Sequence, residues 1–253
     1  MFFVADGRDT LLGAEGRDWL VGEAGDDVLI GESLPHASGA TGAQVYRLYS
    51  ATLGRPPDSA GFTSWTARLD AGQSLRAILP GFVRSAGFQK TFGALDDRAF
   101  VTLLYHNVLE RAPDRPGLNA WAGRLGNGMS RAEVVEGFAQ SREFTQKTAA
   151  PFRAFMRDFE GDTLAGGAGE DLLLGSFRAD RFVFDAAQAG RDRVLRIDPW
   201  DTIDLRGFGY GNAVAAPAQF SEVGPDTVFS DGDVSVVFAI SGLKTLADTA
   251  FLL

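Results

Sequence analysis

The sequence of 253 residues lacks several residue types and patterns that common classes of protein require. It contains no cysteine and two histidines, which excludes a disulfide scaffold and a thiolate zinc site and leaves little for imidazole catalysis. No apolar run approaches the ~18–20 residues that span a bilayer, so no transmembrane helix is expected. Acidic residues outnumber basic ones by 33 to 24, whereas a nucleic-acid binder normally carries a clustered basic excess. The catalytic motifs His-Glu-x-x-His and Gly-x-Ser-x-Gly and the phosphate loop are also missing.

The net charge of −9 is unevenly distributed along the chain. Residues 1–32 carry a net charge of −6 and residues 158–180 carry −5, whereas residues 33–157 carry +6 and residues 181–253 carry −4. Both strongly acidic segments are rich in glycine, so the carboxylates are concentrated where the backbone turns easily. This local acidity predicts a bound cation.

A nine-residue period runs through both acidic segments. In each repeat an aspartate lies two residues before an apolar residue, and glycines precede it in the turn. The repeated aspartates are Asp9, Asp18, Asp27, Asp162, Asp171 and Asp180. The glycines that we expect to shape the metal-binding turns are Gly7, Gly16, Gly25, Gly167 and Gly169. The apolar partners are Leu11, Leu20, Leu29, Leu164, Leu173 and Phe182.

These segments resemble the G-G-x-G-x-D-x-U-x nonapeptide of RTX proteins, in which U is apolar. Residues 166–174 fit every position, whereas Ala14, Glu23 and Arg178 stand where glycine is usual. The resemblance implies a parallel β-roll with U pointing inward. Stacked turns about 4.8 Å apart could surround Ca2+, which takes about 6–8 oxygen ligands. The aspartates and glycines named above are the predicted ligands; the alternative is ordinary turns or a solvated linker.

The length of each array bears on how the roll is built. Three repeats make one and a half coils, which cannot bury a continuous core alone. We therefore predict that both arrays form one composite roll into which residues 36–156 are inserted. Separate small rolls, or rolls completed by a neighbouring molecule, are the alternatives.

The inserted segment contains an internal duplication. Residues 45–90 and 101–146 match at an offset of 56 and share the pattern Arg-x-Pro-Asp-x-x-Gly-x-x-x-Trp-x-x-Arg-Leu. Apolar residues recur at intervals of three and four, which is helical periodicity. Asp58 and Asp114 follow proline and suit helix N-caps. Each repeat therefore predicts three or four short helices, and together they predict a pseudo-symmetric bundle.

This duplicated block resembles a bacterial domain of uncharacterised function that recurs in RTX and surface-associated proteins. Its paired Trp and Arg residues could bind a sugar or carboxylate by stacking and bidentate contacts. Alternatively, the Trp residues pack the bundle and the Arg residues pair with the capping aspartates. The residues concerned are Arg55, Trp65, Arg68, Arg111, Trp121 and Arg124. The positive charge makes an anionic cell-surface polysaccharide, or another surface protein, the candidate partner.

The pattern after the second array changes to alternating strands, which predicts a β cap. Asp231-Gly232 lies between two β-rich runs and predicts a hairpin. The segment resembles the one that closes the roll of serralysin-type metalloproteases, although the protease domain of that family has no counterpart here. Four carboxylates could hold another calcium ion or could be structural; they are Asp192, Asp198, Asp201 and Asp204.

The end of the chain resembles the uncleaved C-terminal signal of type I secretion. An acid, Asp248, precedes the apolar terminus Phe251 to Leu253; an ordinary terminal strand is the alternative. No N-terminal signal peptide is expected, because the chain runs from Met1 directly into the acidic repeats. Low cytosolic calcium would keep the arrays unfolded for export, and higher calcium outside would drive their folding.

The predicted fold class is α+β: a calcium-binding parallel β-roll with a C-terminal β cap and an inserted all-α helical bundle. The predicted domains are RTX repeats at 1–35, the duplicated helical domain at 36–156, RTX repeats at 157–183, and the β cap with its secretion signal at 184–253. We expect a secreted, non-enzymatic protein with Ca2+ as its cofactor and no catalytic residues. It would serve cell-surface attachment or extracellular assembly, including self-association. The alternative is an extracellular enzyme, or an accessory module, that acts on polysaccharide.

Overall fold

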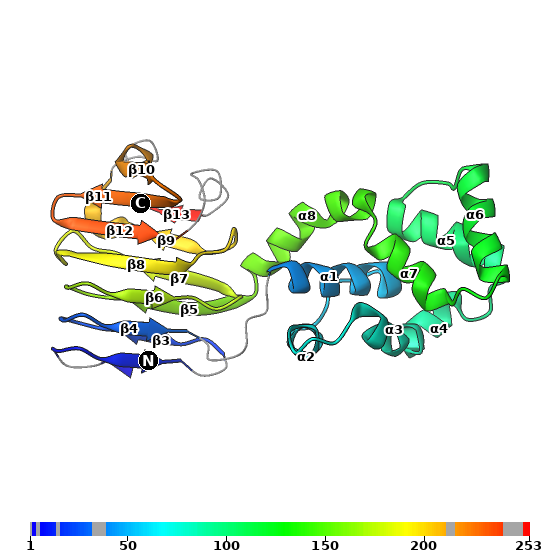
Figure 1. The fold of residues 1–253 in the computed structure, drawn as a ribbon, viewed down its shortest axis with the longest axis horizontal. Helices are drawn as coiled ribbons and strands as arrows, with labels where there is room; N and C mark the ends of the chain where they lie inside the picture. Colours follow the sequence, from blue (N-terminus) through cyan, green and yellow to red (C-terminus); the bar gives the residue numbers. More distant parts are fainter. Residues whose placement is uncertain (1, 4–5, 14–15, 32–38, 211–215, 240–249) are drawn as a thin grey trace. The chain divides into compact units, whose positions relative to one another are not determined.

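The protein is described by a computed structural model for residues 2–3, 6–13, 16–31, 39–210, 216–239 and 250–253. The chain divides into two compact units, a roll formed by Met1–Leu34 with Arg153–Leu253 and a helical unit formed by Pro35–Phe152 (Figure 1). The sequence prediction placed the inserted segment at residues 36–156. Within the described residues, no helix combines the length and the apolar character needed to cross a membrane.

The roll consists of two sheets, here called sheet A and sheet B. Sheet A contains, in spatial order, β1 (Phe2–Phe3), β3 (Trp19–Val21), β5 (Glu160–Ala165), β7 (Ala179–Val183), β9 (Thr202–Asp204) and β13 (Ala250–Leu252). Sheet B contains β10 (Phe220–Val223), β11 (Asp226–Asp231), β12 (Val234–Phe238), β8 (Gly190–Arg196), β6 (Leu172–Leu174), β4 (Val28–Ile30) and β2 (Thr10–Leu12). The repeat strands alternate between the two sheets and pair in parallel, as expected for a roll.

The apolar residue of each nonapeptide forms the core of the roll. The three-residue strands bury their middle residue and turn the flanking residues outward. The apolar repeat residues Leu20, Leu29, Leu164, Leu173 and Phe182 are completely buried. They pack in one cluster with residues of the cap. Removal of this apolar surface from water is the main stabilising contribution of the repeats, and the nine-residue period predicted it.

The two repeat arrays form one continuous roll. Strand β3 of the first array pairs with β5 of the second, with Leu20 opposite Leu164. Strand β4 likewise pairs with β6, with Leu29 opposite Leu173. Figure 1 shows the strands of both arrays stacked in a single series. The prediction of a composite roll agrees with this arrangement.

The helical unit interrupts a single nonapeptide. Within an array, the backbone N–H of Asp9 meets the side chain of Asp27, which lies 18 residues later. Across the insertion, Asp18 meets Asp162 in the same way at a separation of 144 residues. The insertion therefore adds 144 minus 18, or 126, residues without disturbing the register.

Gly31 and Asp162 are the first and sixth residues of that interrupted repeat. In the unbroken repeat, Oδ2 of Asp171 lies 2.3 Å from the position that a Cβ on Gly166 would take. Asp162 has the same relation to Gly31, at 2.4 Å. One turn of the roll is thus assembled from residues on both sides of the helical unit.

The cap closes the C-terminal end of the roll. Strands β8 and β9 extend sheets B and A in parallel. Strand β12 pairs with β8 in parallel as well, and β11 and β10 follow it as antiparallel strands. Asp231 pairs with Val234 across the predicted hairpin, and Gly232 takes φ +57° in its turn. The terminal strand β13 pairs in parallel with β9. Asp248, at the start of the predicted secretion signal, lies outside the described residues.

The helical unit contains four helices from each sequence repeat. The first four are α1 (Gly39–Leu53), α2 (Ser59–Asp70), α3 (Leu75–Val83) and α4 (Ala86–Phe92). The second four are α5 (Asp97–Leu109), α6 (Arg115–Gly126), α7 (Arg131–Ala139) and α8 (Arg142–Arg157), the last of which continues into the roll sequence. Asp58 and Asp114 cap α2 and α6, and Ser130 with Glu133 forms a capping box on α7. The caps predicted from the sequence are confirmed.

Candidate functional site

The predicted metal-binding aspartates lie in two rows, one along each side of the roll. The first Asp ladder lies just before or near the start of strands of sheet B and contains Asp9, Asp27, Asp171 and Asp192. The second Asp ladder lies just before or near the start of strands of sheet A and contains Asp18, Asp162, Asp180 and Asp201. Each ladder gathers residues from both repeat arrays and from the cap.

Neighbouring aspartates of a ladder are joined by the same kind of hydrogen bond, from the backbone N–H of one residue to the carboxylate of the next. Oδ1 of Asp27 accepts the backbone N–H of Asp9 at 2.8 Å, and Oδ1 of Asp171 accepts that of Asp27 at 2.9 Å. The second ladder repeats the bond, with distances of 2.8, 2.7 and 2.9 Å along its length. These bonds fix the orientation of each carboxylate and leave its second oxygen pointing into the turn.

Within the part of the chain that the structure describes, two of these second oxygens are buried without a hydrogen-bond partner. They are Oδ2 of Asp27 and Oδ2 of Asp171, on side chains that are 1% and 2% exposed. A buried carboxylate oxygen without a donor is costly, because the charge has lost its hydration. A proton or a cation must therefore compensate it.

Glycine keeps the space beside these oxygens open. A Cβ on Gly22 would lie 2.4 Å from Oδ2 of Asp27, and one on Gly166 would lie 2.3 Å from Oδ2 of Asp171. The five glycines predicted as site residues, Gly7, Gly16, Gly25, Gly167 and Gly169, all have φ between +107° and +145°. That backbone conformation suits glycine and turns the chain tightly around the ladder.

The donor set fits a hard cation. Among the described residues, no three carboxylate or imidazole side chains converge in a way that could hold an ion. Backbone carbonyls of the turns must therefore supply most of the ligands, beside the aspartate oxygens. Oxygen ligands of this kind suit Ca2+, whereas a site for zinc or copper would need imidazole or thiolate groups.

Burial raises the pKa of most ladder carboxyls in the absence of a cation. It raises the pKa of Asp27 and of Asp171. Burial and the neighbouring Asp162 carboxylate raise the pKa of Asp180 to about 7, and burial with the Asp171 carboxylate raises that of Asp192 to about 8. The metal-free ladders therefore hold protons near neutral pH that a divalent cation would displace.

The Trp residues proposed for partner binding are half-buried and packed against side chains of their own repeat. The guanidinium of Arg68 lies 4.7 Å from the Trp65 ring, and the Phe82 ring lies 5.1 Å from it. A Cβ on Gly81 would come within 2.9 Å of the indole. The second repeat has the same arrangement with Arg124, Trp121, Phe138 and Gly137.

The remaining two arginines of that set form ion pairs. Arg55 lies 3.6 Å from the capping Asp58. Arg111 makes a bidentate pair with Glu143, with bonds of 2.8 and 2.9 Å. These contacts favour the packing interpretation, and partner binding by this set stays a prediction.

Comparison with known families identifies both parts of the chain. The description "RTX calcium-binding nonapeptide repeat (4 copies)" applies to residues 4–33 and 160–182. These segments are RTX calcium-binding repeats. The description "Domain of unknown function (DUF4214)" applies to residues 37–92 and 80–148, so the duplicated helical unit carries a DUF4214 domain.

Two further comparisons concern whole proteins. No curated protein matches the chain. Among solved structures, the extracellular lipase LipA from Serratia marcescens is similar with a TM-score of 0.43 and 13% sequence identity. The match covers 99% of this chain and 20% of the lipase chain, so this chain spans about a fifth of the length of that protein.

The RTX roll extends its ladders beyond the nine-residue period. Asp192 and Asp201 each follow the preceding ladder residue by 21 positions instead of 18, which is why the period did not place them among the predicted ligands. Asp198 donates its backbone N–H to Oδ2 of Asp201. Asp204 instead pairs with Arg181 and Arg206 outside the ladders. In the sequence, the alternation of Asp with short β runs in the cap was the pattern that pointed to these aspartates.

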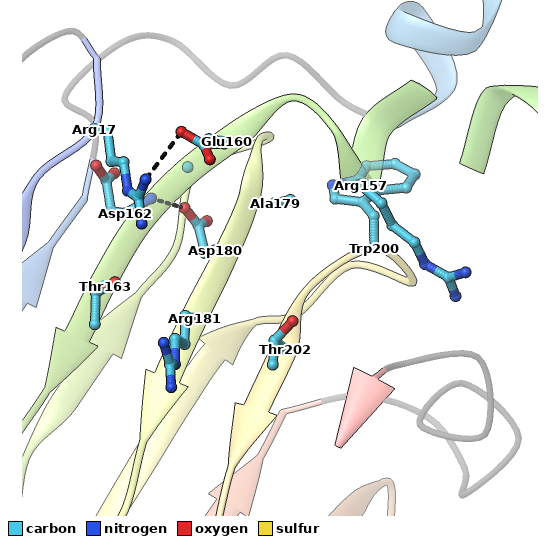
Figure 2. Close-up of a pocket in the computed structure, with 11 residues that line it drawn as sticks. Arg17, Arg157, Glu160, Asp162, Thr163, Ala179, Asp180, Arg181, Trp200 and Thr202 are labelled. Carbon is cyan, nitrogen blue, oxygen red and sulfur yellow. Dashed lines mark hydrogen bonds and ion pairs between the residues drawn. The ribbon is translucent and has the colours of Figure 1, made fainter. Parts of the chain in front are cut away.

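The turn of the second ladder opens into a small pocket. This pocket has a volume of 220 Å³ and is lined by Asp162, Asp180 and Trp200 among others. Figure 2 shows the backbone of Asp162 bonded to the Asp180 side chain at one end of it. Arg17 and Glu160 form an exposed ion pair of 3.0 Å at its rim. The pocket therefore leads from the surface toward the second ladder, in which Asp162 and Asp180 are each 1% exposed.

The metal-free RTX roll is expected to lose stability as the pH rises. The folded-state pKa values of Asp180 and Asp192, about 7 and about 8, lie above the ordinary value of 3.8. Their stabilising contribution is full below about 3.8 and is lost as the pH passes through 7 to 8. In EDTA, the melting temperature of the roll should therefore fall between pH 5.5 and 8.5.

Saturating calcium provides the control for this measurement. Because calcium binds the ionised carboxylates, its affinity rises with pH. The decrease of the melting temperature with pH should therefore become smaller, or turn into an increase, in saturating calcium. A metal-free melting temperature that stays constant or rises over the same range would contradict the assignment of these buried carboxyls.

Proposed function

We propose that this protein is secreted, folds its RTX roll on binding calcium outside the cell, and serves surface attachment or extracellular assembly without catalysis. The observation that carries this proposal is the pair of buried Oδ2 atoms of Asp27 and Asp171, for which the described residues provide no hydrogen-bond partner. Both face glycine-lined space inside the turns of calcium-binding repeats. A bound Ca2+ there would satisfy these oxygens and offset the repulsion within each ladder.

The same chemistry makes folding of the roll depend on the calcium concentration of the surrounding compartment. At low cytosolic calcium, the ladders would bury several carboxylates at close spacing, which disfavours the folded roll. In a calcium-rich medium, binding to the folded state stabilises it by mass action. The roll would therefore stay unfolded during export and fold after it.

The attachment role rests on the charge and on the lack of a catalytic constellation in the sequence. The segment that holds the helical unit, residues 33–157, carries a net charge of +6. A basic module in the same chain as a calcium-neutralised roll would favour binding to an anionic cell-surface polysaccharide. The spare carboxylates of the roll are engaged in the ladders, which leaves few for glycoside hydrolysis.

Incubation of the calcium-loaded protein with purified anionic surface glycans tests the proposal. Co-sedimentation without release of reducing ends is the expected result. A steady release of reducing ends would instead establish the alternative, an enzyme acting on polysaccharide. Binding that persists unchanged in EDTA, above the melting temperature of the metal-free roll, would show that the roll has no part in attachment.

A further inference from the structure

The outward-facing side chains of sheet A form a row that neither the core nor the ladders use. Trp19 of β3 lies beside Thr163 of β5, Thr163 lies beside Arg181 of β7, and Arg181 lies beside Thr202 of β9. Figure 2 shows Thr163, Arg181 and Thr202 on three neighbouring strands. At a strand spacing of about 4.8 Å, the row extends over ~14 Å, which suits a short oligosaccharide.

A groove of 460 Å³ follows part of this row. Trp19 lines it, and this side chain is 49% exposed. The fold does not require an aromatic residue there, because the equivalent positions on the next two strands are Thr163 and Arg181. An exposed indole beside hydroxyl and guanidinium groups offers a flat apolar surface with polar groups at its edge.

Two guanidinium groups in the groove are held in place by one buried carboxylate. Asp204 is 3% exposed and accepts bonds from Nε and Nη2 of both Arg181 and Arg206. Although burial alone would raise its pKa, the bonds from Arg206 and Arg181 lower the pKa of Asp204 to about 2. Asp204 therefore stays ionised and keeps both guanidinium groups oriented at any physiological pH.

This arrangement leaves positive charge and donors for a ligand. Both guanidinium groups share the single negative charge of Asp204, and the other carboxylate that lines the groove, Asp18, belongs to the second Asp ladder. Among the described residues, Nη1 of Arg181 and Nη1 of Arg206 have no acceptor, because both groups use Nε and Nη2 for Asp204. Guanidinium groups held in this way are suited to a planar carboxylate.

We propose that this groove on sheet A binds an acidic oligosaccharide through the carboxylate of a uronate unit. Trp19 stacks on the apolar face of one sugar ring, and Arg181 and Arg206 bind the carboxylate of a neighbouring unit. The hydroxyls of Thr163 and Thr202 bond to sugar hydroxyls between and beyond them. The site is separate from the Trp and Arg residues of the helical unit, whose indoles are half-buried.

The inference rests on the proposed function in one respect, because the roll must be calcium-loaded for the strands to bring these residues into one row. It adds a ligand class and a location to that function. The two proposals can fail separately, since folding of the roll is followed by circular dichroism and ligand binding by calorimetry on the same samples.

The test uses the full chain in saturating calcium and a trisaccharide of galacturonic acid. Its methyl ester, which has the same rings without the charge, is the matched ligand control. Saturable binding of the acid and at least about tenfold weaker binding of the ester are expected, because the charge-assisted bonds are lost. Arg206→Gln should weaken binding of the acid by about tenfold, and Trp19→Ala by about fivefold.

Arg191→Gln is the control variant, because it removes the same charge from an exposed position on β8 of sheet B. It should leave the affinity unchanged. Trp19 and Arg191 are exposed side chains, so their variants should keep the calcium-loaded melting temperature of the wild type. Arg206→Gln removes one of the two guanidinium partners of the buried Asp204 and should lower the melting temperature, so affinities are compared at a temperature at which circular dichroism shows every variant folded. Equal affinity for acid and ester, equal loss in all three variants, or no binding by a calcium-folded roll would overturn the proposal.

Discussion

Removal of calcium is expected to lower the melting temperature of the roll strongly and to leave the melting transition of the helical unit unchanged. The roll depends on two ladders of buried carboxylates, whereas the helical unit has an apolar core of its own that includes the fully buried Phe62 and Phe100. At a free calcium concentration 1,000 times the dissociation constant, each bound ion contributes about 4 kcal/mol. Several ions therefore account for a large part of the stability of a domain of this size.

Circular dichroism with increasing EDTA measures this effect. In EDTA, the β-sheet signal should be lost at a much lower temperature than in calcium, while the helical signal keeps a separate melting transition. Magnesium is the control, because its strict octahedral geometry fits a carbonyl-rich turn poorly, so it should not restore the roll. A melting curve that is the same with and without EDTA would refute calcium-dependent folding.

The substitution Asp171→Asn should have opposite effects on the two states of the roll. Asparagine keeps an oxygen that can accept the backbone N–H of Asp27, at present a bond of 2.9 Å, but removes a buried charge. Burial raises the pKa of Asp171, so the ionised side chain destabilises the metal-free roll. Its removal should raise the metal-free melting temperature by about 2–4 °C, or ~1 kcal/mol.

The calcium-loaded form should respond in the other direction. Loss of one charged ligand should weaken calcium binding at the adjoining turns by at least about tenfold, and the calcium-loaded melting temperature should fall. Asp233→Asn removes the same charge from an exposed turn of the cap and should change neither state. If Asp171→Asn lowers the melting temperature in EDTA as well, the side chain is a structural hydrogen-bonding group and not a calcium ligand.

The repeat pattern predicted the roll because its period reports directly on burial. Each apolar residue of the nonapeptide became a core residue, and each aspartate in the period took a place on a ladder. The helical caps were equally predictable, since Asp58 and Ser130 act on residues three positions away. Local spacing was sufficient in both cases.

The groove on sheet A could not be predicted in the same way. Trp19 and Arg181 are 162 positions apart in the chain, and they come together only through the register of β3, β5 and β7. The cap aspartates were difficult for a related reason, because loops of a different length precede Asp192 and Asp201. Position within a repeat determines which way a side chain points, but not its neighbours on adjacent strands.

The split nonapeptide affects the entropy of assembling the roll. Gly31 and Asp162 belong to one turn, so an unfolded insert of 126 residues would have to be closed as a loop. By the logarithmic dependence on length, that closure costs about 4 kcal/mol. A folded helical unit removes most of this cost, because its first and last helices already touch: the rings of Tyr46 in α1 and Phe152 in α8 lie 5.5 Å apart. The folded helical unit thus lowers the entropic cost of joining the two repeat arrays. Substitutions that unfold it should therefore raise the calcium concentration at which the roll forms.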